Sequence, residues 1–395
     1  MTSSALAGRN SLRPILGWRD PYGWLWGGVG FLLLSQSVGG QASYSAESLT
    51  FKAIAAGGQH TCGVSVGGEV FCWGSHQQGQ LGLSAQQPVL RPVRVAGVGQ
   101  VIGIAAEGSQ TCALRATGQA VCWGSDRLPS GEVSAVHTPQ PTAVPLGDPV
   151  QSISLGRHHA CFLSQPPAIY CQGSNLLGQV GTIVDAGTAA AQPVAVRHLG
   201  AVVGVAAGAV HTCGLLPTGG VSCWGDFGLG SGSYQPIPMQ GVVNGQGLAA
   251  GNRFTCALLR DGRVRCWGVD DFGQLGNGSL DVPGAAVFVN GIGEAQAIAA
   301  GSYHACAVVA GGAVKCWGAN ILGQLGDGTT QSSPIPVTVK GLPPAIALSL
   351  GEGHSCALLT DQTARCWGYN LSGQLGNGTT LNSAVPVMVE GSPSP

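Results

Sequence analysis

The cysteines place the strongest constraint on how this chain can fold. The sequence contains 14 cysteines, and each of them stands ten residues from one other cysteine. The seven pairs are Cys62-Cys72, Cys112-Cys122, Cys161-Cys171, Cys213-Cys223, Cys256-Cys266, Cys306-Cys316 and Cys356-Cys366. Successive pairs begin 43 to 52 residues apart, a period typical of propellers and other repeat folds. The chain is therefore predicted to contain seven copies of one supersecondary unit.

A spacing of ten suits two cysteines that face each other across a tight β-hairpin. In the fifth repeat, residues 256–266 read as two strands around the loop 260–262, which ends in a glycine suited to the left-handed position. This register sets Cys256 opposite Cys266 at a non-hydrogen-bonded pair, where Cα atoms lie about 4.5 Å apart. A disulfide accepts that distance. We therefore predict one disulfide per repeat and an oxidising compartment.

The alternatives for these cysteines are a zinc framework or a catalytic thiol. Neither explains an even set of pairs at cross-strand spacing without any Cys-x-x-Cys motif. Glycine also recurs at the third loop position, which supports a common hairpin register, at residues 68, 118, 219, 262 and 312. Pro167 and Gln362 occupy that position in the other two repeats, where we predict a different loop conformation.

The N-terminal segment is typical of an export signal. Arginines precede an apolar stretch over residues 22–34, and the small residues Gly40 and Ala42 suit a cleavage site before Ser43. An uncleaved membrane anchor is the alternative, although the apolar part is shorter than the roughly 20 residues that a span needs. The predicted organisation is a signal peptide over 1–42, a linker over 43–50, a propeller over 51–391 and a tail over 392–395.

The charge of the chain excludes two classes of partner. The formal net charge is −1, charged residues make up 9% of the sequence, and no run of Lys or Arg occurs. Affinity for nucleic acid or for anionic lipid depends on a basic patch. We therefore expect neither nucleic acid nor a membrane surface as a partner, apart from the signal segment itself.

The repeats carry a further motif beyond the cysteines. Each second cysteine is followed by Trp-Gly in all repeats but the third, where Gln172 replaces the tryptophan, and Gly-Gln-Leu-Gly stands at 79–82, 273–276, 323–326 and 373–376. Residues 178–181 read Gly-Gln-Val-Gly, and the second and fourth repeats lack the element. Over residues 51–391 the sequence resembles the regulator of chromosome condensation repeat family, in its secreted, cysteine-paired, bacterial type.

This resemblance implies an all-β fold. The fold would be a closed seven-bladed β-propeller of four-stranded antiparallel blades, in which the last strands pair with the first to close the ring. Closure would matter because it leaves no long unpaired strand edge.

The candidate chemical groups favour structural roles. His60, His159, His211, His304 and His354 share one repeat position, so their atoms lie too far apart to bind one metal ion, and each is expected to bond nearby backbone. No hydrolase or metalloprotease motif occurs. A secreted carbohydrate-active enzyme would need a carboxylate pair, for which Asp270 and Asp271 are the adjacent candidates. We expect no catalysis, no cofactor and no metal.

Two stretches depart from the repeat pattern and are candidates for binding. Residues 125–145 and 226–238 are predicted surface loops, and their arginine and aromatic residues are of the types that anchor protein interfaces. The candidate binding residues are Arg127, Phe227 and Tyr234.

These features predict an exported, non-catalytic scaffold that binds a protein or a cell-surface polymer through one loop face. It would be a monomer located outside the cell, in the periplasm or at the cell surface. Alternatives are a regulator that exchanges guanine nucleotides on a small GTPase, as the family name suggests, and a secreted enzyme inhibitor similar to the propellers that inhibit β-lactamases.

Overall fold

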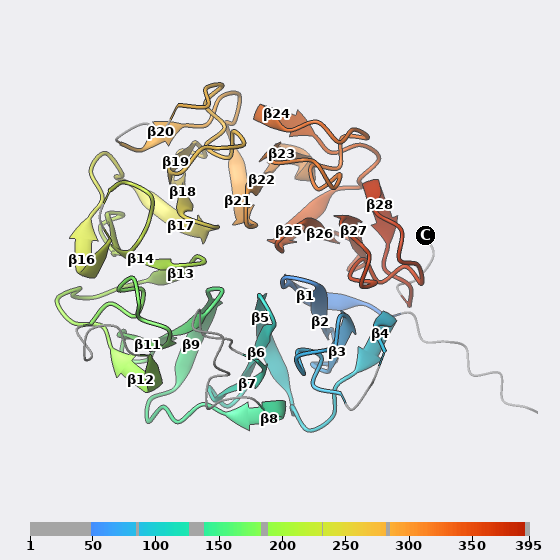
Figure 1. Ribbon diagram of the computed structural model, residues 1–395, viewed down its shortest axis with the longest axis horizontal. Coiled ribbons are helices and arrows are strands. Elements are labelled where there is room, and N and C mark those ends of the chain that lie inside the picture. The colour runs from blue at the N-terminus through green and yellow to red at the C-terminus, as the bar shows by residue number, and fades with distance from the viewer. Residues whose placement is uncertain are drawn as a thin grey trace, which may run out of the picture. The chain divides into compact units, whose positions relative to one another are not determined.

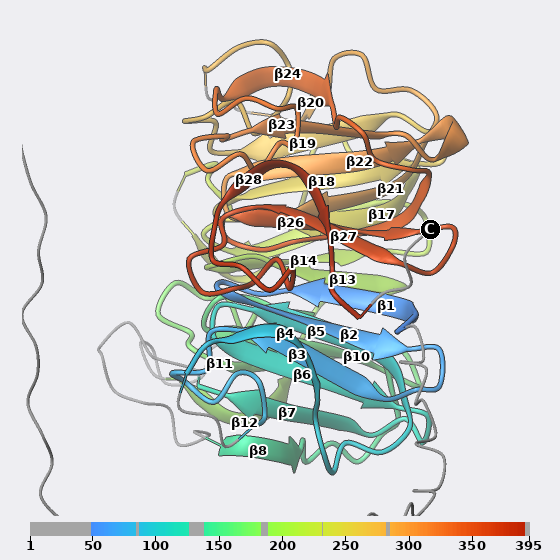
Figure 2. The same cartoon turned by 90° about the vertical axis from the view of Figure 1, so that its right-hand side faces the viewer.

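The described residues form a seven-bladed propeller. The computed structural model describes residues 49–83, 87–125, 138–182, 189–230, 232–281 and 285–391. They fold into seven four-stranded antiparallel sheets, which follow one another as blades around a central channel (Figure 1). The strands run between two loop faces (Figure 2). The predicted all-β fold of seven four-stranded antiparallel blades is thereby confirmed.

The predicted signal segment, residues 1–42, lies outside the described residues. Among the residues that are described, no helix has the length and apolar character to cross a membrane.

The innermost strand of each blade is rich in small residues because seven such strands converge on the channel. A cavity of about 330 Å³ is lined by residues from all seven. The innermost strands are β1 (Phe51–Ala56), β5 (Val101–Glu107), β9 (Val150–Leu155), β13 (Gly204–Ala207), β17 (Gly245–Ala250), β21 (Ala295–Ala300) and β25 (Ala345–Leu350).

The second and third strands of each blade form the predicted hairpin. Cys256 lies opposite Cys266, and Leu258 lies opposite Val264, as the register predicted. All seven disulfides are present, with Cα separations of 4.0 to 4.1 Å. The second strands are β2 (His60–Ser65), β6 (Gln110–Arg115), β10 (His159–Ser164), β14 (His211–Leu215), β18 (Phe254–Leu259), β22 (His304–Val309) and β26 (His354–Leu359). The third strands are β3 (Val70–Gly74), β7 (Ala120–Gly124), β11 (Ile169–Gly173), β15 (Val221–Gly225), β19 (Val264–Gly268), β23 (Val314–Gly318) and β27 (Ala364–Gly368).

The outermost strands form the rim. Most of them carry a proline at their fourth residue, which an edge strand tolerates and which discourages pairing with another chain. They are β4 (Val89–Arg94), β8 (Thr138–Ala143), β12 (Ala190–Ala195), β16 (Ser233–Pro238), β20 (Val287–Phe288), β24 (Ser333–Thr338) and β28 (Ser383–Met388). A short 3-10 helix, η1 (Ala310–Gly312), lies in the hairpin of the sixth blade.

The two unusual hairpin loops differ from each other. Gln362 adopts the left-handed conformation, with φ 68°, and its N–H donates to the Leu359 carbonyl at 3.0 Å. Gly262 has φ 77° and makes the same bond to Leu259. The prediction of a different loop at Gln362 is therefore wrong, because glutamine takes up the glycine geometry there. The third blade does differ, with a cis peptide bond between Gln165 and Pro166.

The ends of the propeller meet in a way that the resemblance did not predict. Each blade consists of four consecutive strands, so no strand near one end of the chain completes a blade at the other end. The expected pairing of last strands with first is wrong because the repeat begins at an innermost strand. Blade 7 packs against blade 1 through apolar side chains, among them Phe51, Trp73, Leu358 and Leu375.

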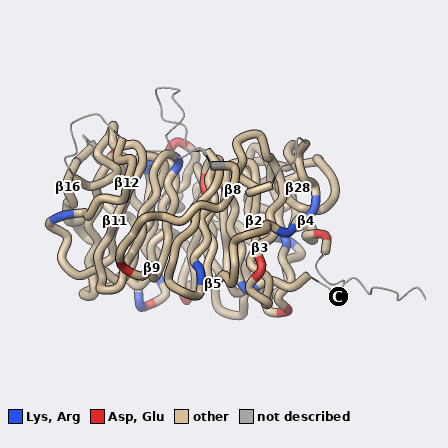
Figure 3. The backbone as a smooth tube through the Cα atoms, turned by 90° about the horizontal axis from the view of Figure 1, so that it is seen from below, with Lys and Arg blue, Asp and Glu red and all other residues tan. Residues whose placement is uncertain are grey.

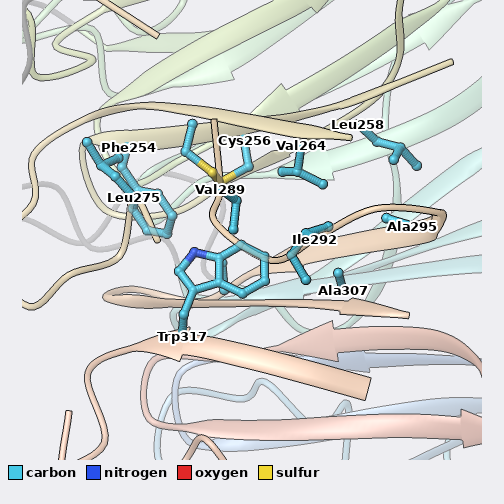
Figure 4. Close-up of a cluster of buried hydrophobic side chains, with 12 residues drawn as sticks. Phe254, Cys256, Leu258, Val264, Leu275, Val289, Ile292, Ala295, Ala307 and Trp317 are labelled. Atoms are coloured by element: carbon cyan, nitrogen blue, oxygen red, sulfur yellow. A yellow bond between two sulfur atoms is a disulfide. The ribbon is translucent and has the colours of Figure 1, made fainter. Parts of the chain in front are cut away.

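The core lies between blades. At the junction of blades 5 and 6, Trp317 packs under the Cys256-Cys266 disulfide and against Phe254 and Leu275 (Figure 4). The same arrangement recurs around the propeller, and the six tryptophans at this position are fully buried. Each tryptophan therefore belongs to one blade and fills the core of the junction with the preceding one.

Repeated polar contacts also join neighbouring blades. At the junction of blades 6 and 7, the Trp367 indole N–H and the Ser355 hydroxyl both donate to the Gln324 carbonyl, at 2.8 Å each. His304 Nε2 lies 2.9 Å from the same hydroxyl. The hydroxyl proton is directed to the carbonyl, so the histidine N–H donates. The Gly-Gln-Leu-Gly motif thus supplies a carbonyl that bonds the next blade.

The five histidines make this contact with the following blade. They are buried, and their Nε2 atoms lie 2.7 to 2.9 Å from a hydroxyl oxygen. The pairs are His60 with Thr111, His159 with Thr212, His211 with Thr255, His304 with Ser355 and His354 with Thr61. The expected partner was nearby backbone, and the structure instead gives a side chain of the next blade.

Candidate binding site at the channel mouth

Two sets of loops meet at one end of the channel. These are the loops that follow the innermost strands and the loops between third and fourth strands, and we call this end the mouth face. The opposite end carries the hairpins and is the hairpin face. A cavity of about 310 Å³ lies on the mouth face over blades 7, 1, 2 and 3. We call it the mouth cavity, and the side chains that line it include Gln59, Ser75, Gln77, Ser125, Arg157 and Glu352.

An ion pair spans this cavity between blades that are not neighbours. Arg157 of blade 3 pairs with Glu352 of blade 7 at 3.3 Å, although blades 1 and 2 lie between them. The same repeat position in those two blades is occupied by Gly58 and Gly108. A Cβ at residue 58 would lie 3.1 Å from the Glu352 carboxyl carbon, and one at residue 108 would lie 3.2 Å from the Arg157 carbonyl oxygen. Gly58 therefore leaves space for the Glu352 carboxylate, and Gly108 lets the backbone of blade 3 come close.

A second glutamate stands at a position where the other blades have glycine. That glycine packs on the aromatic ring three residues later, and a Cβ there would lie 2.1 to 2.5 Å from a ring atom. The glycines are Gly57, Gly156, Gly208, Gly251, Gly301 and Gly351. In blade 2 the ring is replaced by Gln110 and the glycine by Glu107. The absence of a ring gives Glu107 its space.

The environment of Glu107 favours its neutral form. Burial, and to a lesser extent the nearby charge of Glu352, raises the pKa of Glu107 to about 8. The Gly108 N–H and the charge of Arg157 oppose this shift and are too weak to cancel it. Within the described residues, Glu107 forms no ion pair. Among the described residues, Arg157 and Glu352 line the mouth cavity, whereas Glu107 lines the channel cavity. Charged residues are scattered over the propeller, and most of the chain around them is uncharged (Figure 3).

The repeated polar contacts are missing beneath this site. At the junction of blades 2 and 3, Gln110 replaces the histidine and Ala160 replaces the hydroxyl residue. Gln172 replaces the tryptophan, and blade 2 has no Gly-Gln-Leu-Gly motif to supply the carbonyl. The groups that make the contacts are absent by sequence, so this junction depends on apolar packing, to which Leu155 and Phe162 contribute.

Apolar side chains are exposed elsewhere on the mouth face. Ile321 and Leu371 are 67% and 62% exposed, and Phe272 is 37% exposed. They lie in the same loop of blades 6, 7 and 5 that contributes Gln77 to the mouth cavity in blade 1. Phe272 also contacts the ring of Tyr303 at 5.3 Å. The mouth face thus combines a polar, charged cavity with exposed apolar residues.

Two of the three binding residues chosen from the sequence lie elsewhere. Arg127 falls outside the described residues. Phe227 packs against the core between blades 4 and 5, and the Tyr234 hydroxyl donates to the Leu176 carbonyl at 3.0 Å. Neither aromatic residue lines the mouth cavity. A binding role for these three residues stays a prediction.

The adjacent carboxylates have separate environments. Asp270 is buried, and its Oδ1 accepts the Leu275 N–H at 2.8 Å, as Asn320 and Asn370 do in their own blades. Burial raises the pKa of Asp270 to about 6. Asp271 is exposed. The first carboxylate therefore stabilises a turn that asparagine stabilises elsewhere.

Comparison with known proteins connects this propeller to a family. Two models of the regulator of chromosome condensation (RCC1) repeat match the chain. One matches residues 51–80, 246–274, 295–324 and 345–374, and the other matches residues 67–114, 261–308 and 312–358. No curated protein matches the sequence.

Solved structures share the fold at low sequence identity. Prp20p from Saccharomyces cerevisiae, studied for its binding to Gsp1p and histones, is 21% identical with a TM-score of 0.67, over 76% of this chain and 80% of that chain. Human WBSCR16 is 22% identical with a TM-score of 0.71, over 81% and 94%. The ectodomain of the Arabidopsis thaliana receptor kinase ACR4 is 20% identical with a TM-score of 0.51, over 86% and 99%. At such identities the likeness concerns the fold alone. The chain therefore contains regulator of chromosome condensation repeats, which the two models match within blades 1, 2, 5, 6 and 7.

Proposed function

We propose that the protein is an exported, non-catalytic scaffold that binds another protein through its mouth face. The observation that carries this proposal is the mouth cavity, where Arg157 and Glu352 meet over two glycines and exposed apolar residues lie on the same face. Interfaces typically combine such apolar contacts with a few polar groups that fix orientation. A rigid propeller also lowers the entropic cost of presenting them.

Two further observations support the proposal. Prp20p, which has the same fold, is described as binding Gsp1p and histones, so a propeller of this kind is compatible with protein partners. Seven disulfides favour an oxidising compartment, because cytosolic thiols are kept reduced. A secreted enzyme inhibitor would be one form of this function.

The alternative is an exchange factor for a small GTPase. Its support is the fold shared with Prp20p, and the disulfides oppose it. Intact mass with and without reduction, on protein from the native host, separates the two. A chain that begins near Ser43 and lacks free thiols is the expected result. A full-length intracellular chain with free thiols would favour the exchange factor.

The binding face is tested by affinity capture from the secreted and surface fractions of the host. Arg157→Ala and Ile321→Ser change the mouth face, and Glu69→Gln changes the hairpin of blade 1 at the opposite end of β2. We expect the partner captured by the wild type to be lost with the first two variants and retained with Glu69→Gln. Equal capture by all variants would contradict the proposed face.

A further inference from the structure

We propose that a loop of blade 5 binds a calcium ion, with Asp270 as its central ligand. The loop, residues 270–281, follows the third strand, β19, and we call it the blade 5 loop. Asp270 is 0% exposed, and within the described residues its Oδ2 has no hydrogen-bond partner. A buried oxygen without a partner costs free energy, and a bound ion can supply the missing contact. The inference is independent of the proposed function and differs from the sequence-based expectation of no metal.

In blades 6 and 7 an asparagine occupies the position of Asp270. The Asn320 Nδ2 lies 3.0 to 3.2 Å from four oxygens, which are Asp327 Oδ1, the Thr329 carbonyl and hydroxyl, and the Gln331 carbonyl. In blade 7 the corresponding Nδ2 lies 3.0 to 3.3 Å from the four equivalent oxygens. The loop thus surrounds one side-chain atom with acceptors, and asparagine provides the donor that they require.

The blade 5 loop keeps the hydrogen bonds that shape this set of oxygens. Asp270 Oδ1 accepts the Leu275 N–H at 2.8 Å, and the equivalent bond in blade 6 is 2.9 Å. The Ser279 N–H donates to Asn277 Oδ1 at 3.1 Å, against 2.9 Å in blade 6. The Asp281 N–H donates to Ser279 Oγ at 3.0 Å, against 3.3 Å. We infer that Asp270 faces the same four oxygens, here Asn277 Oδ1, the Ser279 carbonyl and hydroxyl, and the Asp281 carbonyl.

The carboxylate of Asp270 reverses the chemistry of this position. In blades 6 and 7 an amide group donates to the four oxygens, whereas Asp270 Oδ2 is itself an acceptor. A proton on Asp270 would serve one of the four oxygens, and a metal ion would contact all of them together with Oδ2. Asp281 adds a second carboxylate, which accepts the Ser279 hydroxyl at 3.1 Å. Within the described residues no lysine or arginine pairs with either aspartate, so the negative charge of the loop favours a cation.

The kind and spacing of the ligands favour calcium. Calcium takes about six to eight oxygens, from carboxylates, amides and backbone carbonyls, at about 2.3–2.6 Å. Two oxygens that bind one such ion at neighbouring positions lie about 3 Å apart, which matches the 3.0 to 3.2 Å found around Asn320 Nδ2. The described residues contain no group of three or more His, Cys, Asp or Glu side chains that could hold a metal. The loop therefore lacks the nitrogen and sulfur ligands that zinc prefers.

Thermal unfolding of the metal-stripped protein, in EDTA and in about 5 mM calcium chloride, tests the site. With a Kd of about 0.1 to 1 mM, typical of extracellular calcium modules, the wild-type Tm should rise by about 2 °C. Asp270→Asn supplies the amide of blades 6 and 7, so its Tm should exceed that of the wild type in EDTA and should not rise with calcium. Asp271→Asn, which removes the adjacent exposed carboxylate, should keep the wild-type rise. A calcium response equal in wild type and Asp270→Asn, or absent from both, would overturn the inference.

The number of bound ions provides a second readout. Equilibrium dialysis against radioactive calcium should give one ion per chain in the wild type and none in Asp270→Asn. Asn320→Asp places a carboxylate among the four oxygens of blade 6, one of which belongs to Asp327, and should raise the count to two. An Asp270→Asn variant that keeps its ion would show that calcium binds elsewhere. A count of one in Asn320→Asp would show that the four oxygens do not suffice as ligands, and either result would contradict the proposed site.

Discussion

The junction of blades 6 and 7 and the junction of blades 2 and 3 use the same fold with different chemistry. At the first, His304, Ser355 and Trp367 are bonded to one another or to the Gln324 carbonyl. At the second, the corresponding groups are replaced, and Glu107 takes a position that glycine has elsewhere. The difference shows that the fold tolerates the loss of these contacts at one junction, where the missing ring leaves space for Glu107.

Acid should affect the histidine-bonded junctions most. Burial lowers the pKa of His60, His159, His304 and His354 to about 3 and that of His211 to about 4. Unfolded histidine titrates near 6.5, so below that pH the unfolded state binds more protons and stability falls until the folded values are reached. Each histidine should cost about 1.5 kcal/mol between pH 6.5 and pH 5.

Denaturant unfolding with intact disulfides, at several pH values, measures this loss. His304→Gln places in blade 6 the residue that blade 2 has at this position, Gln110. The slope of its unfolding free energy against pH, between pH 6.5 and pH 5, should be smaller than that of the wild type by the equivalent of about one bound proton. A stability that does not change over this range would contradict the buried, neutral histidines.

Removing a junction tryptophan should have the next largest effect. Trp367 is fully buried and donates to Gln324, so Trp367→Ala should destabilise by about 3 to 5 kcal/mol. Gln172 occupies the equivalent position in blade 3, and Gln172→Ala should cost about 1 kcal/mol. Free energies of unfolding from denaturant titrations provide the comparison. Equal losses would mean that the two junctions do not differ as described.

Restoring the repeat in blade 2 tests why Glu107 fits. Gln110→His alone should destabilise by about 2 kcal/mol, because the ring would collide with the Cβ of Glu107. The double variant Glu107→Gly with Gln110→His should recover most of that loss. A double-mutant cycle on unfolding free energies gives the coupling. Additive effects would contradict the steric explanation.

The ionisation of Glu107 gives a further prediction. Its pKa is raised to about 8 in the folded protein and is near 4.5 when unfolded, so the folded state binds more protons between these values. The free energy of unfolding should therefore fall as pH rises from about 4.5 to 8. Its slope against pH should correspond to a difference of at most one bound proton between the folded and unfolded states. Glu107→Gln should remove this component while the histidine-dependent loss at lower pH persists. An unchanged slope in the variant would show that Glu107 is ionised.

Much of the fold could be predicted from local geometry. The spacing of ten between cysteines predicts the hairpin register and the disulfides, because both depend on residues close in sequence. The contact between blades 7 and 1 could not be predicted. No residue near Phe51 or Val389 in the sequence indicates whether the last strands pair with the first or whether the two blades pack through side chains. The histidine partners were missed for the same reason, because each hydroxyl belongs to the next repeat.

The candidate site was predicted less well. Irregular stretches drew attention to Phe227 and Tyr234, which make structural contacts. The useful signal was in a single repeat position, which reads Glu352, Gly58, Gly108 and Arg157 around neighbouring blades. Aligning the repeats by that position would have indicated an ion pair over two glycines.

The most direct test of the account is site-specific photo-crosslinking in the native host. A photoreactive residue replaces Gln77, beside the mouth cavity, or Val66, which is exposed on the hairpin face of the same blade. We predict one covalent adduct of defined mass from position 77 and none from position 66. Adducts only from position 66, or none from either position, would contradict binding through the mouth face.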